Sequence, residues 1–142
     1  MSKLSWFGVA LSVFLISWTP ARADPGPLAT EWQTVITSQI LAFRTHDADA
    51  ALNYAGDAFH QAFRDPQEFF LAIVGSGYSP IMESVSETYG RYKIVAPDLV
   101  LQEVKLTGPD QSVYEAIYQL SHESSGWRVL GVQLTKTQSI GI

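Results

Sequence analysis

The hydrophobic pattern of this chain changes its period once, across residues 75–80. Before this segment, apolar residues recur every three or four positions, as in a helix with one buried face. After Pro80, apolar and polar residues alternate, as in strands. Two glycines and a residue that precedes proline favour an irregular connection between the halves. The sequence therefore predicts an α+β domain, with N-terminal helices packed on a curved antiparallel β-sheet.

Local signals in the front half mark where helices begin. Thr30 and Gln33 have the spacing of a capping box, and Asp47 can cap a second helix. Asp65 followed by Pro66 is a third start signal, because proline is favoured at the first helical position. Phe59 and Phe63 lie one helical turn apart in a short segment between these helices. Helical segments are expected over residues 31–44, 48–55, 57–64 and 66–74.

The rear half predicts strands joined by short turns. A Glu-Ser-Ser-Gly turn between two β-rich runs is a hairpin signal at the end of the chain. Strands are expected over residues 81–85, 87–96, 99–107, 112–122 and 127–136. In the last strand, strict alternation sets Trp127, Val129 and Gly131 against Leu130, Val132 and Leu134. Both faces would then carry apolar groups, which predicts either a curved sheet or a homodimer formed through the sheet.

The first 23 residues have the features of a signal peptide. Lys3 precedes an apolar run over residues 4–18, which is short for a membrane span. Ala-Arg-Ala then gives a cleavage site after Ala23. The alternative is an uncleaved membrane anchor. With cleavage, residues 24–29 form a flexible leader and residues 30–142 a single domain in the periplasm or outside the cell.

The composition excludes several classes of site. Removal of residues 1–23 leaves seven basic and fourteen acidic side chains, a net charge of −7. This charge argues against nucleic acid and anionic lipid as partners. The chain has no cysteine, and its three histidines are far apart in sequence, so no metal ligand set is predicted. Nucleotide-binding and serine-hydrolase motifs are absent, and no cofactor is expected.

Several short patterns, taken in order, carry a resemblance to a known family. They are Val35-Ile36-x-x-Gln39-Ile40-x-Ala42-Phe43-Arg44, Asp47-Ala48-x-x-Ala51, Phe69 with Val74, Gly77-Tyr78-x-Pro80, Ala116-x-Tyr118-x-Leu120 and Gly126-Trp127-Arg128-Val129-x-Gly131-x-x-Leu134. With these patterns the chain resembles the small exported bacterial proteins called domain of unknown function 4864. The resemblance implies a nuclear-transport-factor-two-like, or cystatin-like, α+β cone, and it implies no established site.

Two positions depart from that family pattern. Members often have a cysteine after the glycine at position 131, where this chain has Val132. They also tend to have Asp-Gly in the turn that here contains Pro109 and Asp110. Because the superfold includes isomerases, dehydratases, binding proteins and dimerisation modules, the resemblance does not choose a function.

Polar groups on otherwise apolar faces are the candidates for ligand binding. Gln39 lies on the apolar stripe of the first helix, and Tyr54, Tyr78, Tyr114 and Tyr118 could turn their hydroxyls into a central cavity. Such groups could orient a small apolar ligand. The structural alternative is that each tyrosine closes the core and satisfies its hydroxyl on backbone or water.

A second hypothesis is enzymatic. Asp57 and His60 are three residues apart and close to Tyr54, a set that could carry out proton transfer in an isomerase or dehydratase. The structural alternative is that Asp57 caps a helical turn and His60 is solvated. The sequence favours a non-catalytic domain that binds a small ligand or another protein, with the proton-transfer enzyme as the alternative.

Overall fold

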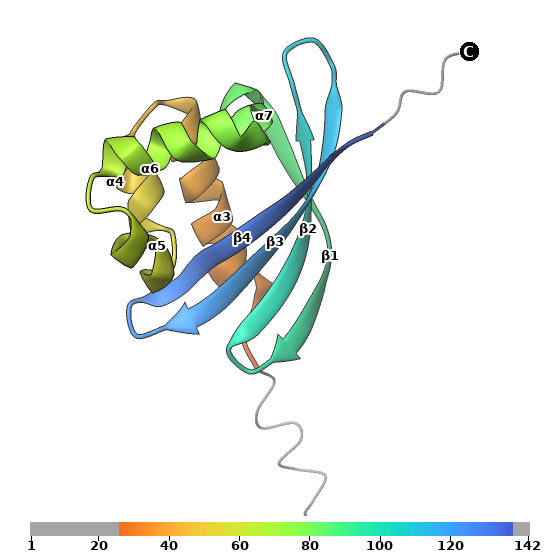
Figure 1. The fold of residues 1–142 in the computed structure, drawn as a ribbon. Helices are drawn as coiled ribbons and strands as arrows, with labels where there is room; N and C mark the ends of the chain where they lie inside the picture. Colours follow the sequence, from red (N-terminus) through yellow and green to blue (C-terminus); the bar gives the residue numbers. More distant parts are fainter. Residues whose placement is uncertain (1–25, 138–142) are drawn as a thin grey trace, which may run out of the picture.

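The computed structural model describes residues 26–137 as an α+β fold, with all the helices on one side of a bent antiparallel sheet (Figure 1). This agrees with the predicted fold class. The expected signal peptide and its cleavage site lie outside the described residues. Within residues 26–137, no helix combines the length and apolar character that a membrane crossing requires.

The helical layer contains four α-helices, a π-helical turn and a short final helix. They are α3 (Ala29–Arg44), α4 (Ala48–Asn53), α5 (Asp57–Ala62), α6 (Pro66–Ile73), η2 (Val74–Tyr78) and α7 (Ser79–Glu83). Two predicted caps are confirmed: the carboxylates of Asp47 and Asp65 accept hydrogen bonds from the backbone N–H groups of Ala50, at 3.1 Å, and Gln67, at 3.0 Å. Each bond satisfies a helix N–H group that otherwise has no partner.

The start of α3 differs from the prediction. Its N-cap is Leu28 rather than Thr30, and the helix is two residues longer at this end. The carboxylate of Glu31, instead of the amide of Gln33, reaches back to the backbone N–H of the N-cap residue, at 3.4 Å. The same spacing of three residues thus occurs two positions earlier along the chain.

The strand predicted over residues 81–85 is wrong, because α7 occupies most of this segment. Pro80 lies in its first turn, where the missing proline N–H costs nothing. Ile81 is buried and α7 packs against α3. Five residues are too few for periodicity to distinguish a helix from a strand.

The four remaining strands form a meander in the order β1-β2-β3-β4. Their bounds are β1 (Ser86–Ala96), β2 (Leu99–Thr107), β3 (Val113–Glu123) and β4 (Gly126–Lys136). The long strands predicted from the alternating pattern are therefore confirmed. Every neighbouring pair is antiparallel, and irregular register in β1 and β4 adds to the bend of the sheet.

A bulge in β4 corrects the predicted faces of this strand. The β3–β4 register shifts between Gln119 and Leu120, where Leu130 is the extra residue. Beyond the bulge Val132 lies opposite Tyr118, a fully buried residue of the inner face. Directly opposed residues share a face, so Val132 and, two residues on, Leu134 point inward with Trp127 and Val129. The outer face is consequently more polar than strict alternation implied, which removes part of the reason for expecting a dimer.

One buried polar side chain, Gln102 of β2, joins α3 to the sheet. Its Oε1 accepts hydrogen bonds from Trp32 Nε1, at 2.8 Å, and Gln33 Nε2, at 3.1 Å. Its Nε2 donates to three backbone carbonyl oxygens, two of which belong to the irregular segment of β1 at Gly90 and Arg91. The side chain is 0% exposed, so these bonds satisfy groups that water does not reach.

A short parallel bridge fixes the helical layer to the edge of the sheet. Val129 donates its N–H to the carbonyl oxygen of Tyr54, at 2.9 Å, and accepts a hydrogen bond from Gly56 N–H, also at 2.9 Å. A β-carbon at Gly56 would lie 2.9 Å from the side-chain ends of Glu123 and Leu130, which would have to shift to admit it. The bridge fixes the helical layer to the first half of β4, and both bridged residues border a cavity that continues along the strand.

Candidate functional site

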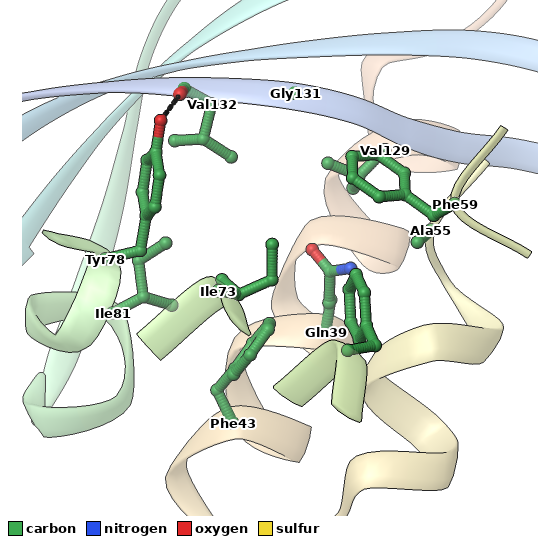
Figure 2. A pocket seen from close by; sticks show the side chains of 11 residues that line it. Gln39, Phe43, Ala55, Phe59, Ile73, Tyr78, Ile81, Val129, Gly131 and Val132 are labelled. Atoms are coloured by element: carbon green, nitrogen blue, oxygen red, sulfur yellow. Dashed lines mark hydrogen bonds between the residues drawn. The ribbon is translucent and has the colours of Figure 1, made fainter. Parts of the chain in front are cut away.

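The cavity lies between the helical layer and the inner face of β4, with a volume of about 190 Å³ (Figure 2). Helices α3, α5, α6 and α7 and the π-helical turn all contribute to its wall. Most of its lining is apolar, from Phe43, Ala55, Phe59, Phe69, Ile73, Ile81, Val129 and Val132. Only Gln39 and Tyr78 bring polar side chains to it. A cavity of about 150 Å³ with such a lining holds benzene, so this one has room for a small organic molecule.

The π-helical turn aims Tyr78 at β4. Gly77 has a φ of 100°, a left-handed conformation that glycine adopts without strain. The turn breaks the helix between α6 and α7 and directs the tyrosine ring along the cavity wall (Figure 2). The Tyr78 hydroxyl donates a hydrogen bond to the carbonyl oxygen of Val132, at 3.0 Å. This bond joins the wall of the cavity to the part of β4 that follows the parallel bridge.

Gln39 extends from α3 into the opposite side of the cavity. Its side chain is only 5% exposed, and its Nε2 donates to the carbonyl oxygen of Ala51 in α4, at 3.0 Å. The Oε1 atom points to the space between Ile73 and Val129 (Figure 2). Within residues 26–137 this oxygen has no hydrogen-bond donor. Gln39 therefore presents an unpaired acceptor to an apolar cavity.

Of the five residues predicted for ligand binding, the structure brings two, Gln39 and Tyr78, to the cavity. Tyr114 is half-buried outside the cavity, with the Lys136 ammonium 6.0 Å from its ring centroid. Tyr118 is on the inner face but does not line the cavity either. Both belong to β3, whereas only β4 provides the sheet side of the wall.

Tyr118 is instead a buried core residue with an unsatisfied hydroxyl. It is 1% exposed, and its hydroxyl oxygen has no hydrogen-bond partner within the described part of the chain. Burial raises the pKa of the Tyr118 hydroxyl far above its ordinary value, because the phenolate would be poorly solvated there. The hydroxyl thus keeps its proton at any physiological pH and provides no base.

The structure does not assemble the predicted proton-transfer group. Asp57 and His60 are both exposed on α5, and neither they nor the half-buried Tyr54 line the cavity. Asp57 is the first residue of α5, where a negative charge interacts favourably with the helix dipole. These three residues therefore do not share a closed pocket; His60 is exposed, and Gly56 rather than Asp57 is the N-cap of α5.

Other hollows in the structure lack the features of a site. One of about 300 Å³ lies on the outer face of the sheet between Tyr92, Leu101 and Ile117, but exposed charged groups line it. Its Arg91 pairs with Glu103 at 2.9 Å, a contact that holds the pKa of the Glu103 carboxyl below its ordinary value. Across residues 26–137, no three His, Asp or Glu side chains lie close enough together to bind a metal ion.

Sequence reasoning missed part of the cavity wall for identifiable reasons. Ile81 was assigned to a strand, although Pro80 could have indicated the first turn of a helix. Strict alternation separates Val132 from Trp127 and Val129, because it cannot register an extra residue. The glycine at position 131 was the available signal, since glycine within a strand often marks a bulge.

Comparison with protein families gives one result. The family described as "Domain of unknown function (DUF4864)" matches residues 27–142. The chain belongs to this family. The DUF4864 match includes every helix and strand named above, so the cavity lies wholly within the family domain. Comparison with curated proteins gives no match.

Proposed function

We propose that this DUF4864 protein binds a small, largely apolar molecule in the cavity between the helical layer and β4. The observation that carries the proposal is the combination of an apolar lining with one unpaired acceptor, Gln39 Oε1, which is accessible from the cavity. Ligand sites in proteins are mostly apolar cavities with a few polar groups that orient the ligand. A cavity that served only as part of the core would lower the free energy of unfolding, and no function would offset this loss.

The same proposal places the protein in the periplasm or outside the cell. The apolar run over residues 4–18 and the Ala-Arg-Ala sequence before residue 24 support export and cleavage. The helices packed on a bent meander suit the nuclear-transport-factor-two-like, or cystatin-like, superfold to which the chain has been likened. A cone of this kind leaves space between its helices and its sheet, which agrees with the position of the cavity.

Native mass spectrometry of the full chain expressed in a bacterium and purified from the periplasm tests the proposal. We expect a chain that begins at Asp24 and carries a bound small molecule. An empty protein is then titrated with toluene, and the backbone amide of Gly131 and the side-chain amide of Gln39 are followed by ¹⁵N NMR. Both signals should shift, because both residues line the cavity.

A pair of variants on α6 locates the binding site. Ile73→Phe adds volume to a residue of the cavity wall, and Leu71→Phe makes a similar change at an exposed position of the same helix. Toluene binding should be lost in the first variant and kept in the second. Equal toluene binding in both folded variants would place the ligand elsewhere and contradict the proposal.

Protein interaction through the outer face of the sheet is the alternative function. Ile117 is 40% exposed there, and Leu101 and Tyr92 border the same shallow hollow. The native mass spectrum reports the subunit count directly. An empty cavity in a dimeric protein would favour this alternative, whereas a monomer with a bound molecule would exclude the dimer as a requirement for binding.

A further inference from the structure

The hydrogen-bond partners of the two polar wall residues restrict the chemistry of a ligand. The amide of Gln39 has a fixed orientation, because the carbonyl oxygen of Ala51 can only accept and must face the Nε2 group. A flipped amide would bring two oxygens together. Oε1 is therefore the atom that the ligand meets, and it is an acceptor with no N–H or O–H donor directed at it in the described structure.

Tyr78 adds an acceptor rather than a donor. Its hydroxyl has one proton, which is used in the bond to the carbonyl oxygen of Val132. What remains free on this oxygen is a lone pair. No Lys, Arg, His, Asp or Glu side chain is among the residues that line the cavity.

We propose that the cavity selects neutral ligands that carry an O–H or N–H donor, of the size of a small phenol or alcohol, and rejects carboxylates. This inference rests on the proposed function, because it assigns the ligand class of the same site. A donor on the ligand would pair with Gln39 Oε1, an acceptor that faces the cavity without a partner among the described residues. A carboxylate would bring a charge to a wall that has no cationic side chain, with only the second N–H of Gln39 Nε2 as a possible donor, and would lose its hydration.

Two ligands of equal size, and a carboxylate that is two heavy atoms larger, test the inference without any change to the protein. The mature protein is titrated with 4-fluorophenol, 4-fluorotoluene and 4-fluorobenzoate at pH 7, and the dissociation constants are measured from ¹⁹F NMR spectra. The first ligand carries a donor, the second has no polar hydrogen and the third is an anion. We expect 4-fluorophenol to bind about tenfold more tightly than 4-fluorotoluene, as one hydrogen bond to an unpaired acceptor allows. We expect no binding of 4-fluorobenzoate at millimolar concentration.

Gln39→Leu removes the acceptor while keeping a side chain of similar bulk. The tenfold preference for 4-fluorophenol should fall to about onefold, and 4-fluorotoluene should still bind. Gln119→Leu is the matched control, because Gln119 is exposed on the outer side of β3. This variant should keep the full preference. If loss of the bond to Ala51 prevents Gln39→Leu from folding, Gln39→Met provides the same test with a longer, flexible side chain.

Each outcome separates the inference from the function on which it rests. Equal affinity for 4-fluorophenol and 4-fluorotoluene would overturn the donor requirement while leaving the proposed ligand binding intact. Tight binding of 4-fluorobenzoate would overturn the exclusion of anions. A preference that persists in Gln39→Leu would show that another atom is the acceptor and overturn the role of Gln39. Failure of all three ligands to bind would refute the proposed function itself.

Discussion

Replacement of Gln102 by leucine tests the claim that one buried amide holds α3 on the sheet. The substitution keeps the volume of the side chain, so cavity formation contributes little. It leaves the indole N–H of Trp32 without its acceptor at a site that water does not reach. An unsatisfied buried donor costs about 1–3 kcal/mol. The two carbonyl oxygens of β1 lie in exposed residues, Gly90 and Arg91, and can recover water, so each adds less than 1 kcal/mol, as an ordinary hydrogen bond would.

The expected total is a loss of about 3 kcal/mol in the free energy of unfolding. Urea denaturation followed by tryptophan fluorescence measures it. With a urea dependence of about 1.5 kcal/mol per molar, the midpoint should fall by about 2 M. Gln119→Leu, an exposed glutamine on the neighbouring strand, should change the free energy by less than about 0.5 kcal/mol.

A double-mutant cycle with Trp32→Phe isolates the indole–amide pair. The two substitutions should be less costly together than the sum of their single effects, by about 1 kcal/mol, because each removes the same hydrogen bond. Unchanged urea midpoints for Gln102→Leu, or strictly additive effects in the cycle, would refute the reasoning.

Two further predictions concern the turn before α7 and the buried tyrosine. Gly77→Ala should destabilise the protein by about 1 kcal/mol in urea denaturation, because alanine is strained at a φ of 100°, whereas Gly75→Ala should be neutral or stabilising; equal effects would contradict the role of the left-handed residue. Tyr118→Phe should not lower the stability at pH 7, because the hydroxyl that it removes is buried without a partner. Above pH 10 the unfolded state loses the Tyr118 proton and the folded state keeps it, so wild-type stability should fall by about 1.4 kcal/mol per pH unit more steeply than that of Tyr118→Phe. Identical alkaline slopes would contradict the raised pKa of Tyr118.

The parts of the fold that sequence reasoning predicted are those with strong local signals. Asp47 and Asp65 mark helix starts with side chains that bond to the adjacent backbone, and no distant residue is needed. The long runs of β1 to β4 likewise show the alternation of apolar and polar residues that is typical of strands, and this pattern is contained within each segment. The segment after Pro80 failed because five residues of α7 provide less than two turns of pattern.

The candidate site was predictable only where it depends on a single element. Gln39 could be found because a polar residue on an apolar helical stripe is conspicuous in sequence. Val132 could not, because its inward direction depends on a bulge that the β3–β4 pairing creates. The solvent exposure of Asp57 and His60 also depends on where α5 packs, and spacing in sequence carries no information about that.

The bridge between Ala55 and Val129 has a consequence for how this protein acquires its structure. The two residues are 74 positions apart, so the helices that are synthesised early are fixed only when the last strand arrives. Contacts of such long sequence separation slow the search for the native state. In an incomplete chain that ends before β4, the apolar face of α3 would be uncovered and prone to self-association. A nascent chain of this kind would therefore benefit from a chaperone until its final residues are made.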